Sequence, residues 1–179
     1  MPRIAFVPED IAEPKEIVDA VRKRRGGTLL AIDRLLLHSP PLTAGWNAYL
    51  GAVRAQLTLP AKPRELAICG VASFNRAEYE FVAHVPYLLQ AGGTQPQADA
   101  LRDLARAATN ASLFDADERA VLQLTLEMTR DVAVTEATFA RATKALGGTQ
   151  QLVELVATIA AYNMVSRFLV ALDLQPDKT

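Results

Sequence analysis

The chain has 179 residues, of which 50% are hydrophobic and 22% are charged, and its 19 Lys and Arg residues nearly balance its 20 Asp and Glu residues. These values are typical of a soluble globular protein, and a chain of this length folds without needing a disulfide or a structural metal. The formal net charge of -1 provides no positive field that would attract nucleic acid or an anionic membrane, so we expect neither as a partner.

The single cysteine, Cys69, excludes an intrachain disulfide and a Cys-x2-Cys redox pair, and it favours a reducing compartment. The N-terminus has acidic residues and prolines where a secretory signal would have a basic start and an apolar run. The uncharged stretch 35–53 contains Pro40 and Pro41, which argue against a membrane span. We therefore expect a cytoplasmic protein with a single domain, 1–179.

Apolar residues recur with helical spacing along the chain, and no series of alternating, β-branched runs interrupts them. This pattern predicts an all-α fold. The first helices are expected at 13–25, 28–38 and 42–57, bounded by Gly26-Gly27, by Pro40-Pro41 and by the segment with Pro60 and Pro63. A further helix has Pro63 in its first turn and breaks near Asn75 and Arg76, and the next one covers 77–90.

The second half of the chain has clear capping signals. Thr94 or Gln95 starts a short helix that extends to about residue 108, Asp115 caps a helix over 116–130, and Thr135 caps a helix over 136–146. The last helix, 150–172, is apolar on most sides, so we expect it to be the most buried helix or to lie at an interface.

Glu80 and His84 are the sharpest candidates for chemistry. Their spacing of four puts both side chains on one face of the 77–90 helix. A carboxylate beside an imidazole can hold one ring nitrogen and leave the other to exchange a proton near neutral pH. The alternative is a solvated surface pair, but the helix is apolar on several sides, which favours a less hydrated pair.

Glu65 lies on the preceding helix and could approach His84 if the two helices fold back on one another. Its simpler explanation is a favourable position in the first turn of a helix. Arg64 points elsewhere on the helical wheel, so these two neighbours need not pair.

Arg167 shares one face of the last helix with Asn163 and Ser166. It could bind a substrate carboxylate, or it could bridge helices or subunits. Tyr79, next to Glu80, is a second candidate for substrate binding. Glu80 and His84 with Glu65 would supply at most three ligands to a metal, so we expect neither a metal nor another cofactor.

The stretch PRELAICGVASFNRAEYEFVAHVPYLLQAG resembles the core of the carboxymuconolactone decarboxylase family, which belongs to the same superfamily as alkyl hydroperoxidase D. The peroxidase branch has a Glu, eleven residues, and then Cys-x2-Cys-x3-His. The same spacing here reads Glu65, eleven residues, Ala77, Glu80 and His84, so both redox cysteines are replaced. With the later segment AYNMVSRFL, the resemblance covers about 36–172 and leaves 1–35 as an N-terminal helical extension.

This resemblance implies an all-α fold of the alkyl hydroperoxidase D type and a homo-oligomer such as a dimer, trimer or hexamer. It also implies that Glu65, Glu80 and His84 are catalytic residues lining a pocket, with Glu65 in the place of the proton-relay glutamate of the peroxidase branch. Thiol-based peroxide reduction needs an attacking thiolate and a resolving thiol, and neither is present at positions 77 and 80.

Three functions therefore remain as hypotheses. The first is a cofactor-free lyase or isomerase that uses general acid–base chemistry on a small carboxylated lactone or oxo acid, which the resemblance connects with aromatic compound catabolism. The second is an alkyl hydroperoxidase-like peroxidase, against which the missing cysteine pair argues. The third is a non-catalytic oligomeric binding protein, so the sequence leaves open whether the chain is an enzyme.

Overall fold

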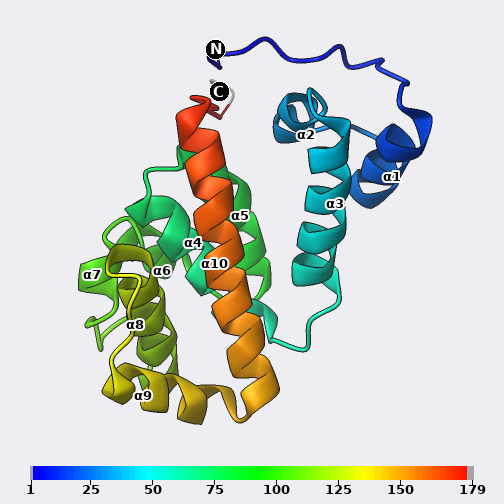
Figure 1. Cartoon of the computed structure of the whole chain (residues 1–179). Coiled ribbons are helices and arrows are strands. Elements are labelled where there is room, and N and C mark those ends of the chain that lie inside the picture. Colours follow the sequence, from blue (N-terminus) through cyan, green and yellow to red (C-terminus); the bar gives the residue numbers. More distant parts are fainter. Residues whose placement is uncertain (1, 177–179) are drawn as a thin grey trace. The chain divides into compact units, whose positions relative to one another are not determined.

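The computed structural model describes residues 2–176, and these residues form helices with no strand among them (Figure 1). This confirms the all-α prediction. The contacts divide the described residues into two compact units, one formed by 2–57 with Leu172–Leu174 and the other by Thr58–Ala171 with 175–176. The division thus falls later than the predicted end of the N-terminal extension at residue 35. The single-domain organisation stays a prediction.

The first unit contains α1 (Lys15–Arg25), α2 (Ala31–Leu36) and α3 (Pro40–Ala55). Pro40 and Pro41 occupy the first turn of α3, where a missing backbone N–H costs nothing, so they begin this helix two residues earlier than predicted. Helix α2 is shorter than the predicted 28–38. Trp46, Leu50 and Val53 form the buried side of α3.

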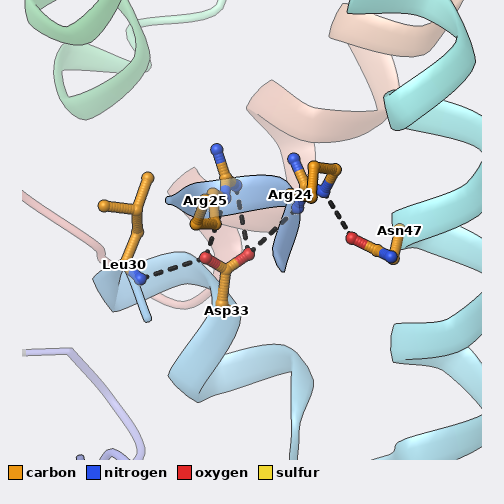
Figure 2. Close-up of polar contacts among 5 residues, drawn as sticks. All are labelled: Arg24, Arg25, Leu30, Asp33 and Asn47. Carbon is orange, nitrogen blue, oxygen red and sulfur yellow. Dashed lines mark hydrogen bonds and ion pairs between the residues drawn. The ribbon is translucent and has the colours of Figure 1, made fainter. Parts of the chain in front are cut away.

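A buried carboxylate joins the three helices of the first unit (Figure 2). Asp33 is 1% exposed, and its two oxygens accept hydrogen bonds from Nε and Nη2 of Arg25 at 2.9 and 3.0 Å. Arg24 contributes a longer contact of 3.4 Å, and the backbone N–H of Leu30 donates at 3.0 Å. Arg24 also donates to Asn47 of α3. The network therefore ties the end of α1 to the start of α2 and to α3.

The second unit contains α4 (Ala61–Phe74), α5 (Glu78–Gln90), α6 (Gln95–Ala100), α7 (Leu104–Ala107), α8 (Ala116–Arg130), α9 (Glu136–Leu146) and α10 (Thr149–Ala171). Helix α4 is central in this unit, because α5, α7, α8 and α10 all pack against it. Every residue from Glu65 to Ala72 is buried. A Cβ at Gly70 would lie 2.9 Å from Cδ1 of Leu104, so glycine permits the close approach of α7.

The prediction that the last helix is the most buried one is wrong. Helix α10 packs on α4, α5, α8 and α9, but Val153, Met164 and Val170 remain exposed on its outer side. It is long and apolar enough to cross a membrane, a property that core helices share. Part of its apolar surface is buried inside the unit, and a membrane protein is not indicated.

The capping signals of the second half of the chain are confirmed at α8 and α9. Asp115 accepts a hydrogen bond from the backbone N–H of Glu118 at 2.8 Å, and Thr135 accepts one from Thr138 at 3.3 Å. The single helix predicted over 95–108 is instead divided into α6 and α7. The reason is that the side chain of Asp103 caps a new helix by accepting from the backbone N–H of Arg106 at 3.1 Å.

Glu127 links the end of α8 to the start of α9. Its carboxylate accepts hydrogen bonds from the backbone and hydroxyl of Thr135, from the hydroxyl of Thr138 at 2.7 Å and from Gln123 at 2.9 Å. Burial raises the pKa of this carboxyl, but the hydrogen bonds outweigh burial and lower the pKa to about 2. The connection is therefore held by a charged acceptor.

Candidate acid–base site

A short turn between α4 and α5 builds the candidate site. Helix α4 ends at Phe74 with Asn75 as its C-cap, and Arg76 takes a left-handed backbone conformation with φ 61°. The backbone N–H of Ala77 then donates to the carbonyl of Ala72 at 2.8 Å, and α5 begins at the next residue. Because the turn is short, α5 folds back along α4 (Figure 1). This is the arrangement in which Glu65 was expected to approach His84.

The structure brings Glu65, Glu80 and His84 together as a buried triad. Nδ1 of His84 lies 2.6 Å from Oε2 of Glu65, and Nε2 lies 3.0 Å from Oε1 of Glu80. Glu65 and His84 are each 2% exposed, and Glu80 is 6% exposed. A solvated surface pair is thereby excluded, since both ring nitrogens are occupied by carboxylates inside the unit.

The two contacts determine which form of His84 the site favours. A neutral imidazole has one N–H and can donate to one carboxylate, whereas the imidazolium donates to both. Burial alone lowers the pKa of His84, but the hydrogen bonds and negative charges of Glu65 and Glu80 outweigh burial and raise the pKa above its usual value. The contacts therefore favour the imidazolium form of His84.

Arg64 extends this chain of charges by one member. Its Nε lies 3.2 Å from Oε1 of Glu65, so the neighbours do pair, although their positions on the helical wheel did not require it. The arginine side chain is long enough to reach back along the helix surface. From Arg64 through Glu65 and His84 to Glu80, positive and negative groups alternate.

Two tyrosines flank the imidazole. Tyr162 of α10 is buried and meets the ring of His84 edge-on, with 5.1 Å between ring centroids. Tyr87 of α5 is exposed and lies tilted against the same ring at 5.7 Å. The sequence analysis missed both contacts. The position of Tyr87, three residues after His84, was a usable signal, whereas nothing local pointed to Tyr162 because it comes from a distant helix.

Of the two candidate substrate-binding residues, Arg167 bonds to Asn163 and not to the triad. Arg167 is exposed, and its Nη1 donates to the backbone oxygen and to Oδ1 of Asn163 at 3.0 and 2.6 Å. Asn163 in turn bonds Asn75 and Thr129. Tyr79 is half-buried beside Glu80. A role of either residue in substrate binding stays a prediction.

Cys69 lies one turn after Glu65 and is completely buried. Burial, followed by the negative charges of Glu65 and Glu80, raises its pKa far above the usual value for a thiol. A thiol in this state provides no thiolate for nucleophilic attack. Among residues 2–176, no group of three or more His, Cys, Asp or Glu side chains is arranged to hold a metal ion.

The segment of the chain that contains the triad matches a known protein family. Residues 40–120 match the model of the carboxymuconolactone decarboxylase family, which confirms the resemblance read from the sequence. No curated protein matches the chain.

Solved structures show the fold. An uncharacterized peroxidase-related protein from Ralstonia eutropha JMP134, described as an alkylhydroperoxidase AhpD core, superposes with a TM-score of 0.81 at 21% identity and covers 99% of this chain and 93% of its own. A peroxidase-related protein from Silicibacter sp. TM1040 gives 0.77 at 20%, with 95% and 89% covered. A variant of the debrominase Bmp8 in complex with 2,3,4-tribromopyrrole gives 0.76 at 14%, with 97% and 90% covered. The chain therefore has an alkyl hydroperoxidase D-like helical fold.

Proposed function

Because residues 40–120 match the carboxymuconolactone decarboxylase family and contain the triad, we propose that the chain is a cofactor-free lyase or isomerase. Its substrate would be a small carboxylated lactone or oxo acid. The observation that supports this proposal most directly is the buried His84, whose two ring nitrogens each face a carboxylate. Such an arrangement positions an imidazole between two carboxylates, and general acid–base catalysis uses side chains positioned in this way to transfer protons.

Glu80 is the member of the triad that we expect to meet the substrate. Its side chain is 8% exposed, against 2% for those of Glu65 and His84, and His84 has no ring nitrogen left for a substrate while both contacts persist. His84 would then supply Glu80 with protons, and Glu65 would stabilise the imidazolium from the other side.

The proposed decarboxylation balances with one proton. The bond between the substrate carbon and its carboxylate breaks, carbon dioxide leaves, and the electron pair is delocalised into the neighbouring carbonyl group. The protonated form of Glu80 then transfers its proton to carbon, and Glu80 is reprotonated through His84 from solvent. An isomerase would use the same groups to remove a proton from one carbon and return it to another, with no net change.

This proposal can be tested in deuterated water by NMR. Wild-type protein is incubated with a panel of unsaturated lactone carboxylates and β-oxo acids, and loss of carbon dioxide and incorporation of deuterium at carbon are followed. We expect Glu80→Gln and His84→Asn to slow the reaction of any accepted compound by about 10²–10⁴-fold, the usual contribution of a general acid or base. Glu78→Gln is the matched control, because Glu78 lies on the same helix but pairs with Arg102 at the surface. Unchanged turnover in His84→Asn would exclude the mechanism.

Peroxidase activity is the second candidate, because two of the structures with this fold are named peroxidase-related. The buried Cys69, with its raised pKa, argues against it. We expect no sustained peroxide consumption with a dithiol reductant and no reaction of Cys69 with a thiol reagent until the protein unfolds. Repeated turnover of peroxide that is abolished by Cys69→Ser would replace the acid–base proposal.

A further inference from the structure

Only part of the guanidinium of Arg64 is bound by another residue. Its side chain is 20% exposed, and its Nε contacts Oε1 of Glu65. Within residues 2–176 the guanidinium makes no other hydrogen bond or ion pair, so Nη1 and Nη2 have no protein partner there. A guanidinium that is held at one edge and open at the other presents two parallel donors.

Other cations of the second unit differ from Arg64 in this respect. Lys62, two residues earlier on α4, pairs with Glu118 at 2.6 Å. Arg102 forms a bidentate pair with Glu78, and Arg167 is bound to Asn163. Among these, Arg64 is the cation that is attached to the triad and still has free donors.

The charged groups of the triad give a second reason to assign substrate binding to Arg64. Glu65 and Glu80 place two acidic side chains around His84, and a cation beside them favours the approach of a carboxylated substrate. Arg64 is a cation in direct contact with this group, and its open edge fits a carboxylate in the bidentate geometry that arginine favours.

We propose that Arg64 binds a carboxylate of the substrate through Nη1 and Nη2 while its Nε remains on Glu65. This inference rests on the proposed acid–base function and adds a substrate-binding residue to it. Arg64 and Glu80 stand at opposite ends of the chain of four charged groups. The substrate is then an acid whose anchoring carboxylate is separate from the carbon that exchanges the proton.

The test uses 2-furoate, a small planar ring carboxylate, and its neutral amide, 2-furamide, which has nearly the same shape. Binding of each compound is measured by NMR titration of the full-length protein at low ionic strength. We expect wild type to bind 2-furoate about tenfold or more tightly than 2-furamide, the effect of a charge-assisted hydrogen-bond pair. Arg64→Gln should remove this preference, and Arg64→Lys should keep part of it, since lysine retains the charge but not the fork.

Arg130→Gln is the matched control and should leave the preference unchanged, because Arg130 is an arginine of the same unit that pairs with Asp131 at the surface. Melting temperatures of the variants establish that they are folded. If Arg64 only supported Glu65, Arg64→Gln would change the pKa of His84 but keep the preference for 2-furoate, and the proposal would be wrong. It would also be wrong if wild type bound the two compounds equally.

The Arg64 proposal can be wrong while the proposed acid–base function is right, and the two experiments distinguish these cases. A preference for 2-furoate that survives in Arg64→Gln would assign the carboxylate to another cation and leave the acid–base triad standing, because the triad is tested by Glu80→Gln in the deuterium experiment. Absence of both 2-furoate binding and deuterium incorporation in wild type would reject both proposals.

Discussion

At the scale of single residues, the state of His84 determines how the stability of the protein depends on pH. His84 is a buried imidazole whose two nitrogens are each taken by a carboxylate, and its pKa is raised because these contacts outweigh burial. A group whose pKa is higher in the folded state than in the unfolded chain stabilises the fold only while the folded form holds the additional proton.

The resulting pH dependence has a defined sign. The contribution of His84 is complete below its unfolded pKa of about 6.5 and is lost as the pH rises through the higher folded pKa. We therefore expect the melting temperature of wild type to fall between pH 6 and 8.5, a range that stays at or below the unfolded pKa of Cys69.

The variant His84→Asn should lose most of this slope and about 3 kcal/mol of unfolding free energy at pH 6, since it removes the imidazolium that Glu65 and Glu80 both contact. Differential scanning calorimetry at several pH values measures both effects. An equal slope in the two proteins would show that His84 is not the titrating group.

At the scale of helices, buried carboxylates fix the connections. Asp33 joins α1, α2 and α3 of the first unit, and Glu127 joins α8 to α9 in the second. In both cases one acceptor satisfies several donors from different segments, so the loss of one side chain affects more than one helix end.

The network around Asp33 predicts a large effect of a small substitution. Asp33→Asn leaves the guanidinium groups of Arg24 and Arg25 without their charged acceptor, and we expect a loss of about 3 kcal/mol. Hydrogen exchange should then accelerate in α1 and α2. Asp19→Asn is the control, because Asp19 pairs with Lys15 at the surface of α1 and should cost less than about 1 kcal/mol. Similar losses in both variants would contradict a special role of Asp33.

The low pKa of Glu127 predicts that the protein loses stability in acid. Its pKa of about 2 lies below the usual value, so its contribution is present above about pH 4.5 and is lost as the pH falls toward 2. Glu127→Gln should reduce the unfolding free energy by about 2 kcal/mol at pH 7, and its stability should fall less than that of wild type between pH 4.5 and 2. Urea unfolding at these pH values measures the difference. Glu136→Gln, in the exposed first turn of α9, serves as the control and should change stability by a few tenths of a kcal/mol.

At the scale of the whole molecule, apolar side chains remain on the surface of the second unit. Val82, Tyr87 and Leu89 are exposed along α5, in addition to the outer side of α10. Val82 and Leu89 are seven residues apart and share one face of α5, and exposed apolar groups on one face often mark a contact between proteins. We propose that a second copy of the chain covers these side chains.

We therefore expect light scattering to give a mass that is a multiple of the 19.4 kDa of one chain. Replacing Val82 and Leu89 together by Glu should shift this mass toward the monomer, because burial of the new charges is unfavourable. Val132→Glu should not change it, since Val132 is an isolated exposed residue between α8 and α9. A monomer at all accessible concentrations in wild type would contradict the prediction.

The sequence by itself determined the all-α class, most helix ends and the membership of Glu65, Glu80 and His84 in one motif. These features depend on local properties: the 3.6-residue period, capping side chains and spacing along the chain. The interpretation failed where local rules compete, as at Asp103, which starts a new helix inside a segment expected to be continuous.

Only the tertiary structure decided which groups meet and in which state. The burial of the triad, the contact of Tyr162 with His84 and the raised pKa values of His84 and Cys69 depend on helices that are far apart in the sequence. The choice of α4 rather than α10 as the most buried helix, and the pairing of Arg64 with Glu65, also follow from packing and side-chain reach. Desolvation and charge interactions depend on distances in space, and local sequence patterns do not fix those distances.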